Sequence, residues 1–348
     1  MAKSSGKTLV GLDIEPGYVA AVEGRPGRVA IERAAVAPLA PGVVREGDVI
    51  DVETLANTLK TLFAEHKLGK RVRLGVANQR IVMRTIDLPP LDGAKEIASA
   101  VRFQAQDHIP MPLDQVVLEH QSLGIVQTAD GPRTRVVLVA ARRDMVDRLL
   151  EATRHAGLRP AGIDLSAFAM IRALHSPGTS EATLYISVGG MTNLAVAVGT
   201  TCVFTRVVAS GTESMATELA ERRQLTLEHA RQWLEHVGLL MPIDDVDGDA
   251  EIVREARSVL SDGVRRIADE VRNSLDYYVM QEGALAVERA ALTGPAVAVP
   301  GFSEQLGGSL SLPLEVRVVD EGRAGGLGGA QAGRLSVAAG LTVEEVGA

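Results

Sequence analysis

Two stretches of the chain show the same pattern of apolar segments separated by tight turns. The first, LVGLDIEPGYVAAVEG from Leu9, has the form of strand, turn and strand, and a third strand is expected over Arg28–Ala35. The second, LYISVGGMTNLAVAVGTT from Leu184, has the same form and continues into Cys202–Val208. Apolar residues alternate or run continuously within each strand, while Gly and Pro occupy the turns. The pattern predicts two three-stranded meanders.

A helix is expected after each meander, over Asp51–Phe63 and over Ser214–Arg223. Coincidence is one explanation of the repeat, because hairpins are common. The repeated order of meander and helix favours two related lobes instead. The remaining predicted elements are a mostly helical region at 214–281, strands at Ala291–Val299 and Glu315–Val319, and a helix at Gly333–Leu341.

Between the two repeats lies a compact piece with strands and helices of its own. On the helix predicted over Ala94–His108, Ile97, Val101 and Ala105 share one face. The segment IPMP ends that helix, because neither proline can continue it. The other elements predicted here are strands at Val72–Ala77, Val82–Asp87, Gln115–Gly124 and Arg135–Ala141 and a helix at Asp144–Ala156. This piece has the character of a small α/β insertion.

Composition narrows the class of protein. A chain of 348 residues with 46% hydrophobic and 23% charged residues is typical of a globular protein with two domains or lobes. Its net charge of −8 does not indicate a surface for nucleic acid. The single cysteine, Cys202, rules out an internal disulfide. No signal peptide or membrane-spanning stretch of about 20 apolar residues is evident, so we expect any membrane location to come through a partner.

Longer motifs carry a family resemblance. The most specific is AVRFQAQDHIPMPLDQVVLEH (Ala100–His120), and the others are VREGDVIDVETLANTLKTLF, VLVAARRDMVDRLLEATRHAGLRPAGIDL and TRVVASGTESMATELA. With these motifs the chain resembles, over nearly its whole length, the type IV pilus assembly protein PilM family of the actin-like superfamily. The resemblance implies an α/β, two-lobed actin-like (ribonuclease H-like) fold with a small α/β subdomain inserted in the first lobe.

The resemblance also implies a division of the chain. Residues 1–81 and 142–181 would form the first lobe, and 82–141 the inserted, partner-binding subdomain. Residues 182–322 would form the second lobe, with its helical part at about 214–281. A C-terminal helix within 323–348 would return to the first lobe.

In this superfamily a cleft between the lobes holds ATP and Mg²⁺, and two β-hairpin turns direct backbone N–H groups at the phosphates. An acid at the end of each strand usually orients the metal, which makes Asp13 the candidate magnesium residue. The residues that the resemblance implies for nucleotide binding are Asp13, Gly17, Gly189, Gly190, Thr192, Ser210, Gly211, Glu270, Ser274 and Gly294.

Three positions depart from the family pattern. Glu15 stands where glycine is usual, Ser187 where the second acid is expected, and Pro295 within the third glycine-rich turn. A carboxylate facing a phosphate at ~4 Å would cost roughly 1–4 kcal/mol, and Gly17 gives the turn freedom to direct Glu15 towards solvent. Serine supplies no charge for Mg²⁺, and proline supplies no N–H. We therefore expect no catalytic residue and no ATP hydrolysis, while ATP binding without turnover stays open.

Several candidates have plain structural alternatives. Asp13 is also suited to accept hydrogen bonds from turn N–H groups. Ser210 and Thr212 match an ordinary helix N-cap as well as a phosphate loop. Glu270 and Ser274 also fit a solvated polar helix face.

The inserted subdomain is the expected partner site. Phe103 falls on the opposite side of its helix from the main apolar face, which suggests a second packed surface. We expect Val101 and Phe103 to line a groove, with Arg102 at its rim and Met111 close by. The alternative is that these side chains pack inside the subdomain or against the lobe.

The resemblance implies a scaffold at the inner face of the cytoplasmic membrane. It would bind the cytoplasmic N-terminal peptide of a PilN-like single-span membrane protein and contact other pilus platform and motor components. The alternatives are an ATP-dependent conformational switch of the same family and an actin-like division-type membrane adaptor. The adaptor would need a basic amphipathic tail, whereas this sequence closes with LTVEEVGA.

Overall fold

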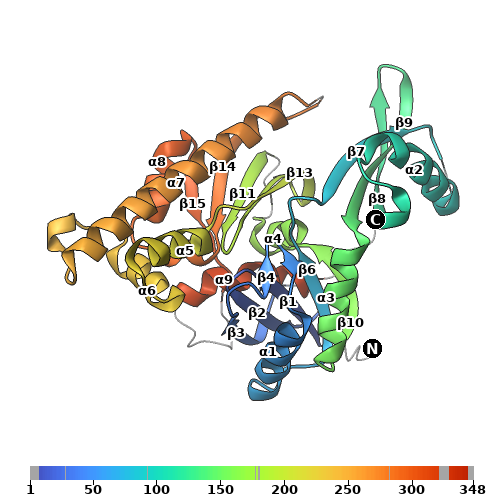
Figure 1. Ribbon diagram of the computed structural model, residues 1–348. Helices are drawn as coiled ribbons and strands as arrows, with labels where there is room; N and C mark the ends of the chain where they lie inside the picture. Colours follow the sequence, from blue (N-terminus) through green and yellow to red (C-terminus); the bar gives the residue numbers. More distant parts are fainter. Residues whose placement is uncertain are drawn as a thin grey trace. The chain divides into compact units, whose positions relative to one another are not determined.

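The computed structural model describes residues 8–343 except 28, 92, 177, 179–180, 282 and 321–328. The described chain divides into two compact units (Figure 1). The first unit runs up to Gln79 and resumes at Thr153, and it contains both β-meanders. The second unit is Arg80–Ala152. It extends beyond the predicted insertion at 82–141 because it takes in most of the helix that follows.

The first meander is part of a mixed sheet with strand order β10-β6-β1-β2-β3. β1, β2 and β3 pair antiparallel, whereas β6 lies parallel to β1 and β10 parallel to β6. The strands are β1 (Leu9–Glu15), β2 (Tyr18–Gly24), β3 (Ile31–Pro38), β6 (Arg71–Val76) and β10 (Arg159–Leu165). Almost every residue of β1 and β2 is buried, which explains their continuous apolar runs. The third strand was predicted over Arg28–Ala35, but β3 runs from Ile31 to Pro38. Arg28 itself lies outside the described residues.

The second meander forms a sheet of the same design, with strand order β13-β12-β11-β14-β15. An antiparallel meander is again followed by two parallel strands. The strands are β11 (Ala182–Val188), β12 (Thr192–Val198), β13 (Thr201–Val208), β14 (Val287–Thr293) and β15 (Leu314–Val316). The predicted strand at Ala291–Val299 is wrong in its second half, because Gly294 and Pro295 end β14 and begin the 3-10 helix η3 (Pro295–Ala298). The repeat of the two lobes is confirmed.

Three helices and a small hairpin pack around the first sheet. They are α1 (Val52–Glu65), α4 (Ser166–Leu174), α9 (Gly329–Leu341) and the hairpin of β4 (Val44–Arg45) and β5 (Asp48–Val49). Asp51 caps α1 by accepting a hydrogen bond from the Thr54 N–H at 3.0 Å. Helix α9 lies directly on β1, because a Cβ added to Gly11 would be 1.9 Å from the Ala338 carbonyl oxygen. The last described helix therefore covers the first strand (Figure 1).

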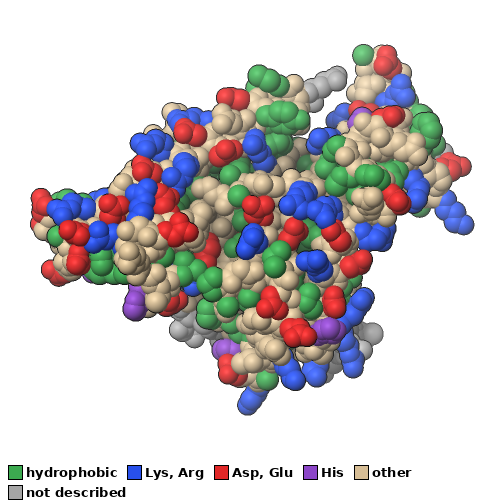
Figure 2. Space-filling model, viewed as in Figure 1, with side chains coloured by type: hydrophobic (Ala, Val, Ile, Leu, Met, Phe, Trp, Pro, Cys, Tyr) green, Lys and Arg blue, Asp and Glu red, His purple; other side chains and the backbone are tan. Residues whose placement is uncertain are grey.

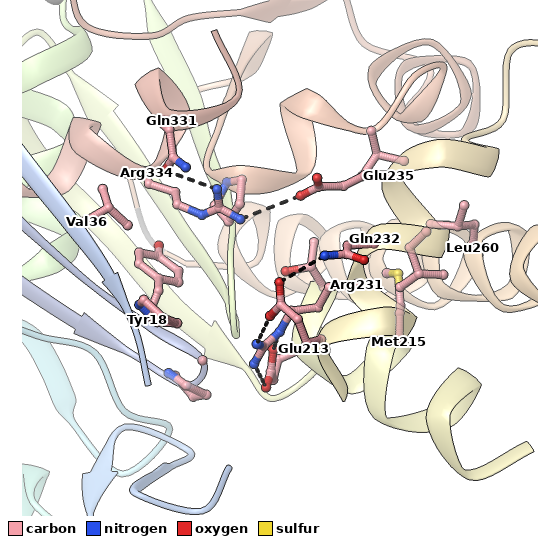
Figure 3. A pocket seen from close by; sticks show the side chains of 18 residues that line it. Tyr18, Val36, Glu213, Met215, Arg231, Gln232, Glu235, Leu260, Gln331 and Arg334 are labelled. Carbon is pink, nitrogen blue, oxygen red and sulfur yellow. Dashed lines mark hydrogen bonds and ion pairs between the residues drawn. The ribbon is translucent and has the colours of Figure 1, made fainter. Parts of the chain in front are cut away.

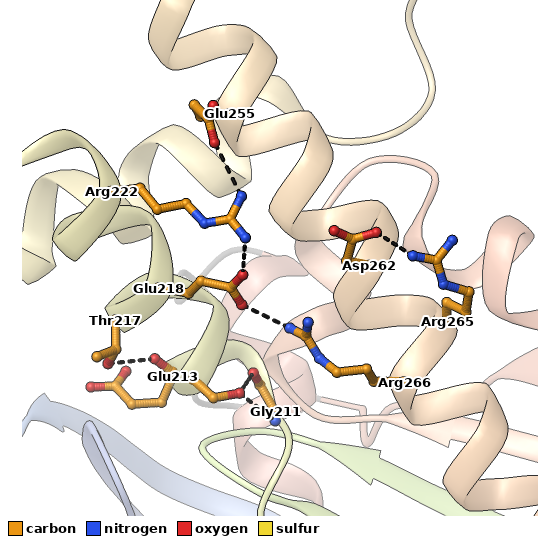
Figure 4. Close-up of polar contacts among 10 residues, drawn as sticks. Gly211, Glu213, Thr217, Glu218, Arg222, Glu255, Asp262, Arg265 and Arg266 are labelled. Carbon is orange, nitrogen blue, oxygen red and sulfur yellow. Dashed lines mark hydrogen bonds and ion pairs between the residues drawn. The ribbon is translucent and has the colours of Figure 1, made fainter.

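The second lobe is completed by helices that pack on one another beside its sheet. They are α5 (Thr212–Arg223), α6 (Leu227–Val237), η2 (Ile243–Asp245), α7 (Ala250–Val279) and α8 (Phe302–Leu310). Gly263 of α7 allows close packing on α5, since a Cβ there would lie 2.4 Å from the Met215 methyl. Ion pairs also join the two helices, with Glu218 accepting from Arg266 at 2.9 Å and Glu255 from Arg222 at 3.1 Å (Figure 4).

The second unit is a three-stranded antiparallel sheet with one helix packed on it. Its elements are β7 (Val82–Leu88), α2 (Ala94–His108), η1 (Leu113–Gln115), β8 (Val116–Thr128) and β9 (Gly131–Arg142), and α3 (Arg143–His155) spans the boundary to the first unit. The strand order is β7-β9-β8. Val101 and Ala105 of α2 pack with Leu138 of β9 in a small core of its own. The unit thus has the helix-on-sheet design that the sequence predicts.

Charge and hydropathy of the described residues agree with the composition. Lys and Arg are interspersed with Asp and Glu over the face shown in Figure 2, without a large area of one sign. Across the described parts of the chain, no helix combines the length and the apolar character needed to span a bilayer.

Candidate functional site

The turns of the two repeated hairpins meet in the first unit. The β1–β2 turn is Pro16-Gly17, and the β11–β12 turn is Gly189-Gly190-Met191. A Cβ added to Gly190 would lie 2.2 Å from the Pro16 carbonyl oxygen and 2.9 Å from its Cδ. Only glycine allows this approach, so the sequence places its glycines where the two lobes touch.

Glu15 points into this contact and not towards solvent, although Gly17 would give the turn freedom to direct it outward. Its side chain is 7% exposed, and Oε2 accepts a hydrogen bond from the Met191 N–H at 3.2 Å. Burial, together with the nearby charge of Asp13, raises the pKa of Glu15 well above its usual range, although the Met191 N–H opposes this. The Glu15 side chain, which would repel a phosphate if ionised, thus lies against the β11–β12 turn.

Asp13 lies two residues earlier on the same strand and is also buried. Burial raises the pKa of Asp13 to about 7, and a hydrogen bond with the Ser166 hydroxyl at the start of α4 opposes the change. Within the described ranges of the chain, no group of three or more His, Cys, Asp or Glu side chains could hold a metal ion. Asp13 and Glu15 thus form a pair of neighbouring buried carboxyl groups.

Ser187 is the last residue but one of β11, at the place where the second acid was expected. It pairs in register with Asn193 of β12 on one side and with Thr293 of β14 on the other. The neighbouring side chains on this part of the sheet are therefore neutral. The Thr293 hydroxyl shares a hydrogen bond of 2.7 Å with Ser336 of α9.

The turn after β13 is tied to the second hairpin by internal hydrogen bonds. The Thr192 hydroxyl donates to the Ser210 carbonyl at 2.7 Å, and the Thr212 N–H donates to the Gly189 carbonyl at 2.8 Å. A Cβ on Gly211 would lie 2.4 Å from that same Gly189 oxygen. The structure thus brings together the predicted residues Gly189, Gly190, Thr192, Ser210 and Gly211. Several of them are joined to this second hairpin by hydrogen bonds or close contacts within the protein.

Helix α5 begins with a local cap. The Gly211 N–H donates to the Ser214 hydroxyl at 3.1 Å, and this hydroxyl donates to the Gly211 carbonyl at 2.8 Å. The Gly211 and Thr212 N–H groups therefore both have partners within the protein. This geometry matches the N-cap alternative considered for this motif.

Gly294 follows β14 and contacts Val188 at the end of β11, next to the second hairpin turn. Its φ is +93°, and a Cβ there would lie 2.5 Å from the Val188 carbonyl oxygen. Both the conformation and the space favour glycine. The following Pro295 borders the cavity described next.

Glu270 and Ser274 lie on α7, and neither borders that cavity. Glu270 pairs with Arg206 of β13 at 3.3 Å, while the Ser274 hydroxyl donates to the Glu270 carbonyl at 2.6 Å. Glu270 is partly exposed and agrees with the polar-face alternative, whereas Ser274 is buried and does not.

A cavity of about 380 Å³ opens on the other side of the first turn (Figure 3). Tyr18 and Val36 line it from the first sheet, and α5, α6 and α9 line it from the opposite side. Its lining also includes Pro16, Gly17, Pro38, Thr212, Glu213, Met215, Glu228, Arg231, Gln232, Leu234, Glu235, Leu260, Pro295, Val299, Gln331 and Arg334. Of the described residues predicted to bind nucleotide, Gly17 lines this cavity.

The charges in the cavity are paired with one another. Arg231 donates two hydrogen bonds to Glu213, at 2.6 and 3.0 Å. Arg334 stacks over the Tyr18 ring with its guanidinium carbon 5.6 Å from the ring centre, and it lies 3.7 Å from Glu235. These residues were missed in the sequence, because they lie in regions for which the sequence predicted only helical structure and no motif marks them there.

The predicted partner residues are divided between two faces of α2. Val101 is 1% exposed and packs in the core of the second unit, whereas Phe103 is 69% exposed. The expectation that Val101 and Phe103 line one groove is therefore wrong, since two residues along a helix turn the side chain by about 200°. Arg102 is exposed, and Met111 packs partly buried against the core.

Two lobes of repeated topology, with facing hairpin turns and a cavity between them, define an actin-like protein. The sequence model of the family "Type IV pilus assembly protein PilM" matches residues 11–324. The chain belongs to this family.

Solved structures agree with this assignment. A chain of the PilM-PilN type IV pilus biogenesis complex is 25% identical with a TM-score of 0.80, and the match covers 97% of this chain and 98% of that one. The ethanolamine utilization protein EutJ from Carboxydothermus hydrogenoformans is 15% identical with a TM-score of 0.55, over 97% and 89% of the two chains. MreB5 of Spiroplasma citri bound to ADP is 13% identical with a TM-score of 0.55, over 96% and 94%. The last two show the fold alone.

Proposed function

We propose that this chain is a scaffold of type IV pilus assembly that docks the cytoplasmic N-terminal segment of a PilN-like single-span membrane protein. The likeness to a chain of the PilM-PilN complex, which extends over nearly the whole length of both chains, carries the proposal. The membrane protein would hold the scaffold at the inner face of the cytoplasmic membrane, where other pilus platform and motor components are further partners.

The docking surface in this proposal is the exposed face of α2 in the second unit. Phe103 exposes a large ring there beside the charged Arg102, a combination that suits an amphipathic peptide with an apolar anchor. Val101 contributes by supporting the helix from the core. Met111 lies at the border of that core and is suited to adapt to a bound side chain.

The cleft in this proposal does not hydrolyse ATP. Ser187 provides no carboxylate for a metal or a hydrolytic water, and the facing turns are already in contact. Asp13 is the residue that would hold Mg²⁺ if nucleotide entered, but the residues around it do not fit a phosphate chain. An ATP-dependent switch is the competing function. Turnover of Mg-ATP by the purified chain, abolished in Asp13→Asn, would favour the switch over the scaffold.

A peptide titration tests the docking. A synthetic peptide with the N-terminal cytoplasmic sequence of the PilN-like protein is titrated against the full chain and followed by calorimetry. Phe103→Asp should weaken binding at least about tenfold, the effect of losing one buried aromatic anchor. Ile125→Asp is the matched control, because Ile125 is 63% exposed in the same unit but lies on β8. Equal affinity of the Phe103→Asp variant and the unaltered chain would remove this face from the site.

A further inference from the structure

A carboxylate of the first lobe is held by the backbone of the second lobe. Glu15 is the last residue of β1, and Met191 closes the glycine turn between β11 and β12. The Met191 N–H donates to Glu15 Oε2 at 3.2 Å, and both side chains are buried. A Cβ on Gly189 would lie 3.6 Å from the same oxygen. The carboxylate therefore lies against the inside of this turn.

The surroundings of that carboxylate have the character of an anion site. N–H groups of a tight turn and the positive end of a helix dipole both favour negative charge. Here the turn is hydrogen bonded to the first residue of α5, through the Thr212 N–H and the Gly189 carbonyl at 2.8 Å. The group that occupies this place in the structure is the Glu15 carboxyl group of the same protein.

A second anion finds little space there. A Cβ added to Gly190 would collide with the Pro16 carbonyl. A Cβ added to Gly189 would lie 3.1 Å from the Tyr18 hydroxyl. Two N–H groups of the turn also have partners within the protein. Gly189 donates to the Met191 carbonyl at 2.8 Å, and Met191 donates to Glu15.

We propose that the Glu15 side chain occupies the place of a phosphate between the two hairpins, so that the cleft selects against ligands with a phosphate chain. The proposal rests on the proposed function in that the cleft is taken not to turn over ATP. Its consequence is that the two lobes are joined in the absence of any nucleotide.

The test replaces Glu15 and measures two quantities, the affinity for Mg-ATP by equilibrium dialysis and the hydrogen-exchange rate of the Met191 amide without ligand. Glu15→Gly removes the carboxyl side chain and opens the space beside the turn. We expect its affinity for Mg-ATP to rise about tenfold or more over the unaltered chain, and its Met191 amide to exchange faster. Inorganic pyrophosphate, used as a second probe, should show the same gain.

Two further variants separate the role of Glu15 from general damage. Glu15→Gln keeps the size and an acceptor oxygen, so it should protect the Met191 amide and still exclude Mg-ATP. Glu23→Gln is the matched control, because Glu23 is also buried in this sheet but pairs with Arg33 of its own lobe at 3.3 Å. It should change neither quantity. If Glu15→Gly does not fold, Glu15→Ser is measured in its place.

The proposal is overturned if the small variant at position 15 binds Mg-ATP no better than the unaltered chain, or if its Met191 amide is equally protected. The titration with the membrane-protein peptide is run on the same variants and should be unaffected, since α2 lies in the other unit. Loss of peptide binding in the unaltered chain would refute the proposed function and leave the result at Glu15 unchanged.

Discussion

Adding one methyl group to Gly190 tests directly whether the two hairpin turns touch. In Gly190→Ala the new Cβ would stand 2.2 Å from the Pro16 carbonyl oxygen, well inside van der Waals contact. The obstructing atom belongs to the backbone of a proline turn and cannot rotate away, so the turns must separate. The φ angle of Gly190 is not in the left-handed region, so the substitution adds no backbone strain of that kind. Overpacking of this type costs about 1–3 kcal/mol in the free energy of unfolding.

Urea denaturation of the full chain, followed by circular dichroism, measures this cost. Gly308→Ala is the control, because Gly308 lies in α8 with no heavy atom within 4 Å of the added Cβ. The same chemical change should there stabilise the protein by up to about 1 kcal/mol, through helix propensity. If Gly190→Ala is as stable as the unaltered chain to within about 0.5 kcal/mol, the turns do not meet as described.

Two other predictions concern stability. The pKa of Asp13 is about 7 in the folded chain against an ordinary value of 3.8, so the folded state binds this proton more tightly than the unfolded state does. Stability therefore falls as the pH rises from about 4 to about 7. Asp13→Asn should therefore gain stability over the unaltered chain across that range, by on the order of 4 kcal/mol in total, and a pH-independent difference in urea denaturation would contradict the burial of Asp13. In the second unit, Val101→Ala should lower the free energy of unfolding by about 2 kcal/mol, because Val101 is buried. Phe103→Ala should lower it by less than about 0.5 kcal/mol, because Phe103 is exposed. Thermal unfolding that ranks the two variants in the opposite order would contradict this assignment of the two faces of α2.

The fold could be predicted well because each lobe repeats one pattern. Continuous apolar runs separated by Gly or Pro marked β1, β2, β11 and β12, and the spacing of Val101 and Ala105 marked the core face of α2. The ends of elements were less predictable. Residues of η3 are as apolar as a strand, and only the backbone geometry at Gly294 ends β14 there.

The site was predicted only in part, since its properties depend on contacts between residues far apart in the sequence. The glycines of both turns and the missing acid at Ser187 could be recognised locally. The direction of Glu15 could not, because its partner, the Met191 N–H, lies 176 residues away. Likewise, nothing near Arg334 in the sequence indicates that it stacks on Tyr18.

The packing of α9 on β1 has a consequence for biosynthesis. Gly11 needs Ala338 beside it before the apolar face of the first strand is covered, and these residues lie near opposite ends of the described chain. At translation rates of about 5–20 residues per second, the ribosome takes roughly 20 to 60 seconds to make the intervening chain. Throughout that time the nascent first lobe exposes an uncovered β-surface, so early chaperone contact should matter more for this lobe than for the small second unit. At the same rates the second unit, Arg80–Ala152, is made within roughly 4 to 15 seconds.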